Sequence, residues 1–108
     1  MSSQLERQFH QKMVEIYQRA ASECGYRPTR FLQMVVERGG VAAARDLLRA
    51  SRPAEGLSIL WEHGRLDLSV EALVCEQPWR SLFSENEIKE AQDRLRRLGY
   101  EAWGERAE

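Results

Sequence analysis

Residues 3–25 read SQLERQFHQKMVEIYQRAASECG, and this stretch decides the class of fold. Its apolar side chains recur every three or four positions, so they fall on one arc of a helix with about 3.6 residues per turn. Ser3 followed by Glu6 is a capping box, which predicts the start of the helix, and Gly25 predicts its end. We therefore expect a helix over residues 4–24 with one buried face.

The same spacing continues beyond this stretch, and no long alternation of apolar and polar residues predicts a paired strand. Glycine and proline divide the rest of the chain into short segments. Further helices are predicted over residues 29–38, 41–50, 54–63 and 85–98, and from Val70 through Cys75 to an end before Pro78, with an extended linker over 66–69. The predicted fold is an all-α compact bundle of five or six short helices.

Two helices of this bundle carry more specific expectations. Ser84 and Glu87 form a second capping box, which predicts the start of the last helix. Within that helix Glu90 and Arg94 are four residues apart, and we expect them to pair on the solvent side. In residues 29–38 apolar side chains surround most of the helix, so we expect this helix to be central and buried.

The length and composition describe one ordinary domain. The chain has 108 residues, of which 43% are hydrophobic, and this is enough for a hydrophobic core. We place the domain at residues 1–100 and expect residues 101–108 to be a C-terminal tail. No apolar run approaches the roughly 20 residues that span a bilayer, and the first residues lack the apolar core of a signal peptide. The sequence predicts a cytoplasmic protein without membrane contact.

The net charge of -1 conceals two blocks of opposite sign. Residues 27–52 contain six Arg against one Glu and one Asp, a net charge of +4, and residues 53–78 have a net charge of -4. Arg45, Arg49 and Arg52 recur three and four apart, so we expect them to line one exposed face of the third helix. That face either is neutralised within the fold or meets a partner.

Several segments together resemble a family of small uncharacterised bacterial proteins. The main segment is LWEHGRLDLSVEALV at residues 60–74, preceded by RFLQMV at 30–35 and GGVAA at 39–43, and followed by Trp79 to Phe83. The resemblance covers about residues 26–100. It implies a bacterial or mobile-element origin and brings no activity with it.

Aromatic and arginine residues suggest a surface for binding another protein. These residue types concentrate at interface hot spots, and this small domain has more aromatic surface than it can readily bury. The candidate partner-binding residues are Arg45, Arg49, Arg52, Trp61, Trp79 and Trp103. Core packing is the simpler explanation for Trp61 and Trp79, whereas Trp103 follows the last helix. The sequence predicts a non-catalytic bacterial interaction module that binds a protein partner or itself, as a homo-oligomer.

The alternative is a small helix-turn-helix-like protein that binds nucleic acid. Two short helices meet at Gly39 and Gly40, and the second presents the arginine face, as a recognition helix would. The candidate contacts are Arg30, Arg38, Arg45, Arg49 and Arg52. The isoelectric point of about 6.2 weakens this alternative, because nucleic-acid-binding domains are usually basic.

Enzymatic and metal sites have weaker support. The densest titratable cluster surrounds one turn and consists of Glu62, His63, Arg65 and Asp67. Adjacent helical side chains point about 100° apart, so Glu62 does not orient His63, and we expect no enzyme. Instead, Arg65 and Asp67 are expected to anchor a helix crossing and Glu62 to pair with the third helix.

Histidines and cysteines are also too scattered for a zinc site. They are His10, Cys24, His63 and Cys75. Structural zinc sites use closely spaced ligand pairs, and none occurs here, so we expect neither a metal nor another cofactor. We expect both cysteines to be buried free thiols and His10 to be half-buried and bonded to a neighbouring carbonyl.

Overall fold

The structure, a computed structural model, describes residues 3–51 and 55–100. This part of the chain contains six α-helices and two 3-10 turns and no strand, so the predicted all-α fold is confirmed. The elements are α1 (Gln4–Cys24), α2 (Thr29–Arg38), α3 (Gly40–Arg49), α4 (Glu55–Glu62), η1 (Leu66–Leu68), α5 (Val70–Cys75), η2 (Trp79–Leu82) and α6 (Glu85–Arg96). Arg52, Trp103 and the predicted tail at 101–108 lie outside the described residues.

Helix ends follow the local signals in the sequence. Both predicted capping boxes are present, at the starts of α1 and α6, and Gly25 ends α1 with a left-handed φ of 69°. Ser69 caps α5 by accepting a hydrogen bond from the backbone N–H of Ala72. The linker before it is not extended as predicted, because η1 forms a tight 3-10 turn there.

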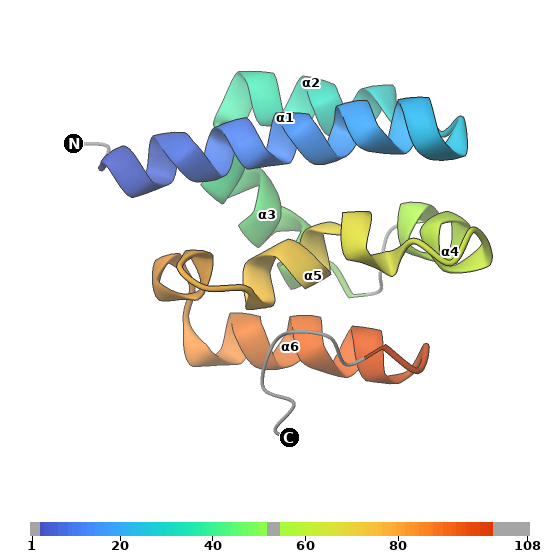
Figure 1. The fold of residues 1–108 in the computed structure, drawn as a ribbon. Coiled ribbons are helices and arrows are strands. Elements are labelled where there is room, and N and C mark those ends of the chain that lie inside the picture. The colour runs from blue at the N-terminus through green and yellow to red at the C-terminus, as the bar shows by residue number, and fades with distance from the viewer. Residues whose placement is uncertain (1–2, 52–54, 101–108) are drawn as a thin grey trace.

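The helices form a bundle with α1 and α2 side by side at one end and α6 at the other (Figure 1). Helices α3, α4 and α5 lie between them. Every residue of α5 is buried, which makes this six-residue helix the centre of the fold. Phe9 of α1 packs against Trp79 and Phe83, with ring centroids 5.8 and 5.3 Å apart. These aromatic pairs connect α1 with the segment that precedes α6.

Helix α2 is not the central element that its apolar residues predicted. Val35 is buried, but Val36 is 67% exposed, and Phe31 and Met34 are half-buried. The helix packs on α1 and α3 with one face. Its remaining apolar residues therefore stay near the surface of the protein.

Helices α1 and α3 approach closely at Gly40. A Cβ atom on Gly40 would lie 2.7 Å from the Cα atom of His10, so a glycine is required for this crossing. The backbone N–H of Gly40 also donates a hydrogen bond of 3.1 Å to Nδ1 of His10. His10 is half-buried as predicted, but it accepts from a backbone N–H instead of bonding to a carbonyl.

Arg94 of α6 is buried, although the sequence places it on the solvent side of its helix. It pairs with Glu90 at 2.7 Å as expected. Its other donors reach three carbonyl oxygens at the end of α3, those of Leu47 (3.0 Å), Leu48 (3.3 Å) and Ala50 (2.8 Å), and Oε2 of Glu71 at 3.4 Å. A guanidinium has five N–H donors, and these five acceptors match them. Arg94 therefore caps α3 from a distant part of the chain and joins it to α5 and α6.

We predict that Arg94→Met destabilises the protein by about 3–5 kcal/mol, because the buried Glu71 carboxylate and the α3 carbonyls lose their donors. Urea denaturation followed by circular dichroism measures this change. Lys89→Met, on the exposed side of the same helix, is the control and should change the unfolding free energy by less than about 0.5 kcal/mol. Equal effects of the two variants would contradict the role assigned to Arg94.

We also predict that Gly40→Ala destabilises by about 1–3 kcal/mol, because the new methyl group meets the backbone of α1. Gly56→Ala in α4 is a matched control, since its methyl group meets the tip of the Tyr26 side chain, which can rotate. In the control, the gain in helix propensity of up to about 1 kcal/mol offsets the contact. Thermal melts of both variants measure the difference in stability between them. Equal melting temperatures would contradict the importance of the close approach between α1 and α3.

Candidate binding cleft

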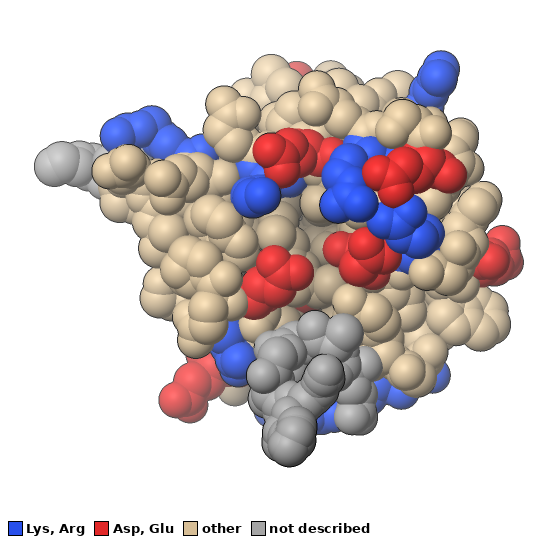
Figure 2. All heavy atoms as spheres, in the orientation of Figure 1, with Lys and Arg blue, Asp and Glu red and all other residues tan. Residues whose placement is uncertain are grey.

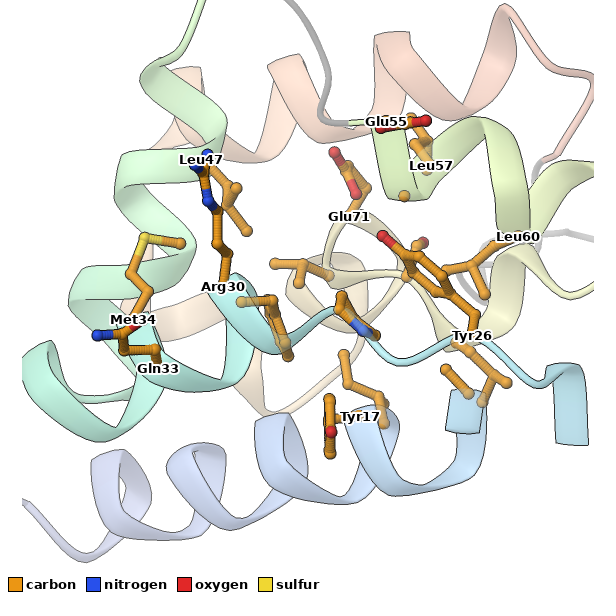
Figure 3. Close-up of a pocket in the computed structure, with 18 of the residues that line it drawn as sticks. Tyr17, Tyr26, Arg30, Gln33, Met34, Leu47, Glu55, Leu57, Leu60 and Glu71 are labelled. Carbon is orange, nitrogen blue, oxygen red and sulfur yellow. The ribbon is translucent and has the colours of Figure 1, made fainter. Parts of the chain in front are cut away.

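A cleft of about 740 Å³ opens at the surface between α2 and α4 (Figure 3). Its walls are mostly apolar and come from α1, α2, α3, α4, η1 and α5. The larger apolar and aromatic side chains that line it are Ile16, Tyr17, Tyr26, Phe31, Met34, Leu47, Leu57, Leu60, Leu68 and Val70. This volume is within the range of sites that bind small ligands or partner side chains.

Tyr26 forms one wall of the cleft, in the connection between α1 and α2. Its ring packs against Gly56 of α4, where a Cβ atom would lie 2.6 Å from the tyrosine hydroxyl oxygen. Burial raises the pKa of the Tyr26 hydroxyl. Gly56 thus allows the aromatic ring to lie flush with α4 at the edge of the cleft.

Glu71 of α5 is the buried acidic group of the cleft, with 6% of the residue exposed. Burial raises the pKa of its carboxyl, and its own backbone N–H and Arg94 partly oppose this increase. Figure 3 shows the carboxylate in the space between Leu47 and Leu57. The cleft therefore combines apolar walls with one acceptor that is poorly solvated.

Charged side chains of both signs surround the cleft. Arg30, Glu37 and Arg38 of α2 and Glu55 of α4 also line it. Arg38 forms an ion pair of 2.6 Å with Asp46. The lining thus includes two cations and two carboxylates at the surface, and Glu71 is an additional, buried carboxylate.

The predicted arginine face of α3 is turned toward η2 and α6. Arg45 donates to the carbonyl oxygen of Leu82 at 2.8 Å, lies 5.8 Å from the ring centroid of Phe83 and pairs with Glu87 at 3.6 Å. Arg49 pairs with Glu87 at 3.5 Å while its side chain remains 71% exposed. The expectation of a fully exposed face is therefore wrong for Arg45. Glu87 from the last helix, not the acidic block at 53–78, neutralises these two arginines.

The two described tryptophans have different environments. Trp79 is buried in the core, as the simpler explanation predicted. Core packing, the simpler explanation for Trp61 as well, is wrong: Trp61 on α4 is 50% exposed and, with Val36, is one of two large apolar residues exposed in the described part of the chain. Trp61 thus stays available to a partner, whereas Trp79 contributes to packing.

Two titratable residues of the turn at 62–67, Arg65 and Asp67, belong to an ion-pair network that reaches α1. Arg65 donates two hydrogen bonds of 3.0 Å to Asp67 and pairs with Glu23 of α1, which also pairs with Arg19 at 2.9 Å. These pairs lower the pKa values of Glu23 and Asp67, mainly through hydrogen bonds from the arginines. The predicted anchoring role of Arg65 and Asp67 is confirmed. On the face shown in Figure 2, acidic and basic side chains are likewise interleaved.

The other residues of that turn and the candidate metal ligands remain separate. Glu62 is exposed and makes no ion pair with α3, contrary to expectation, and His63 is exposed with Nδ1 3.0 Å from the carbonyl oxygen of Ile59. Within residues 3–51 and 55–100, no three His, Cys, Asp or Glu side chains are placed to hold a metal ion. Cys75 is buried and forms no disulfide, as predicted, whereas Cys24, also without a disulfide, is half-buried. None of the described helices is long and apolar enough to cross a membrane.

No family model, curated protein or solved structure matches this chain. The resemblance to small bacterial proteins therefore stays a prediction, and the cleft must be interpreted from its own chemistry.

Two sequence patterns involve residues that line the cleft, but neither pattern alone predicts a cleft. The apolar excess of α2 predicted a buried helix, but Phe31 and Met34 line the cleft instead. Glu71 is the single charged residue in the segment VEALVC, which is buried throughout. A lone acid in a buried apolar helix indicates a special environment, although only its distant neighbours specify which one.

We predict that ionisation of Glu71 and ionisation of Asp67 change the unfolding free energy in opposite directions as pH rises. The raised pKa of Glu71 means that the folded state binds a proton more readily than the unfolded chain above the ordinary pKa of 4.5. Ionisation of Glu71 therefore lowers the unfolding free energy as pH rises from about 4.5 through the folded-state pKa. Glu71→Gln should gain stability relative to wild type over this interval, as measured by urea denaturation at several pH values.

Asp67→Asn is the control, because Arg65 lowers the pKa of Asp67. Its ionisation stabilises the folded state above the ordinary pKa of 3.8, and this contribution is lost as pH falls through the lower folded-state value. The difference between Asp67→Asn and wild type should therefore shrink in acid and stay constant above about pH 5. A pH-independent difference for Glu71→Gln would contradict the assigned burial effect.

Proposed function

We propose that this protein is a non-catalytic interaction module and that its cleft receives an apolar segment of a partner protein. The observation that carries this proposal is the open, mostly apolar cleft of about 740 Å³ between α2 and α4. Folded chains normally cover apolar surface of this kind, and an exposed apolar groove is typical of sites that take an amphipathic helix.

An exposed tryptophan on α4, one of the helices that border the cleft, supports a macromolecular partner. Trp61 exposes half of its surface outside the cleft itself. A partner segment longer than a small molecule has the extent to contact the cleft and Trp61 together. Tryptophan is also among the residue types that concentrate binding energy at interfaces.

The nucleic-acid alternative has less support. Arg45 and Arg49 share Glu87, and Arg38 pairs with Asp46, so each of these candidate phosphate contacts already has an acidic neighbour. Binding to phosphate would have to compete with these pairs. The arginines instead contribute to holding α3 on α6 and α2 on α3.

We predict that the protein selects helical peptides from a random phage-displayed library and that binding depends on the cleft. Met34→Glu introduces a charge into the apolar wall of the cleft. It should raise the dissociation constants of the selected peptides by at least about tenfold, as measured by fluorescence polarisation. Val36→Glu adds the same charge to the same helix outside the cleft and is the matched control, with a smaller expected loss.

Two results would refute the proposed function. One is a selection that yields no binders, and the other is a set of binders equally weakened by both substitutions or by neither. Retention of a random DNA duplex that falls steeply with added salt would favour the nucleic-acid alternative.

A further inference from the structure

The buried position of the Glu71 carboxylate is energetically unfavourable unless the charge contributes to binding. Its carboxylate lies in α5, where the neighbouring side chains are apolar and buried. Removing a carboxylate from water is unfavourable, and it requires compensation by a cation or by hydrogen-bond donors. Compensation within the fold comes from the backbone N–H of Glu71 itself and from Arg94.

Arg94 compensates Glu71 only in part. Its shortest hydrogen bonds go to Glu90 at 2.7 Å and Ala50 at 2.8 Å, while the contact with Glu71 is the longest of the five, at 3.4 Å. That contact ends on Oε2. Because Glu71 also lines the cleft, its carboxylate retains capacity to accept a donor from that side.

Three aromatic side chains also line the cleft. Tyr17, Tyr26 and Phe31 all line the cleft with Glu71. The face of an aromatic ring attracts cations, and aromatic walls with a carboxylate are a common setting for an ammonium or guanidinium group. Within the described residues no group of three metal ligands occurs, so the arrangement does not suit a bare metal ion.

The walls of the cleft also limit which kinds of side chain or ligand can bring a cation to Glu71. They are mostly apolar, so the bound group must have an apolar body as well as a charged end. Lysine and arginine have this form, with an aliphatic stem and a cationic head. Five charged residues line the cleft, Arg30 and Arg38 against Glu37, Glu55 and Glu71, and Glu71 is the buried one.

We propose that the partner segment is an amphipathic helix with one lysine or arginine in its apolar face, and that this cation binds between Glu71 and the aromatic wall of the cleft. The inference rests on the proposed function and adds the chemistry of the partner. Glu71 then acts as the specificity-determining residue, and the apolar walls supply most of the buried area.

The test uses the best binder from the helical peptide library and its own variant in which the basic residue is replaced by methionine. Dissociation constants of both peptides are measured with wild type and with Glu71→Gln by fluorescence polarisation. We expect methionine to weaken binding to wild type by at least about tenfold, and to Glu71→Gln by less than about twofold. Glu55→Gln, which removes an exposed carboxylate at the same cleft, should keep the tenfold preference.

Tyr26→Leu provides a second variant that leaves Glu71 in place. It should reduce the preference for the basic peptide, because the cation loses one aromatic neighbour. Circular dichroism verifies that each variant is folded. If Glu71→Gln does not fold, the preference of Tyr26→Leu for the basic peptide tests the inference: a reduced preference supports the cation site and an unchanged preference refutes it.

Other outcomes overturn the inference. Binders without a basic residue, or an equal preference in wild type and Glu71→Gln, refute the cation site and leave the proposed function intact. Binding of hexylamine but of no peptide assigns the site to small amines and refutes the partner helix. Absence of any binder refutes both proposals, whereas a self-associating protein with a cleft closed to peptides assigns the cleft to a second copy.

Discussion

A buried guanidinium is stable only if all of its donors are satisfied, and Arg94 imposes this requirement on three helices at once. Its donors reach the end of α3, Glu71 in α5 and Glu90 in α6. Displacing any of these elements would leave a charge or several carbonyls unpaired in the interior. The relative positions of α3, α5 and α6 therefore depend on this side chain.

The cleft results from the way in which α1, α2 and α4 pack around α3, α5 and α6. Gly40 brings α3 against α1 at His10, and the short connection after Gly25 directs α2 along α1. Helix α4 follows α3 and packs through Leu57 and Leu60. Glu71, the buried acid that binds Arg94, also lines the apolar cleft between α2 and α4, although only 6% of the residue is exposed.

Charge pairing explains why the cleft, and not the arginine face, is the better candidate site. The basic and acidic blocks of the sequence are not simply matched with each other. Arg45 and Arg49 pair with Glu87 near the end of the chain, and Arg65 pairs with Glu23 near its beginning. These exposed or half-exposed pairs join elements and place a carboxylate beside each of the three arginines, whereas Glu71 is held where solvent compensates its charge poorly.

Local patterns in the sequence account for the ends of α1 and α6, because these ends depend on neighbours three to six residues away. Ser3 with Glu6, Ser84 with Glu87, and the left-handed Gly25 all act within one or two turns. Only the tertiary structure decided that Arg94 is buried, since its carbonyl acceptors lie more than 40 residues earlier in the chain. It likewise decided that Phe31 and Met34 line a cleft: helical periodicity defines an apolar face, but the packing of distant elements decides whether that face is covered.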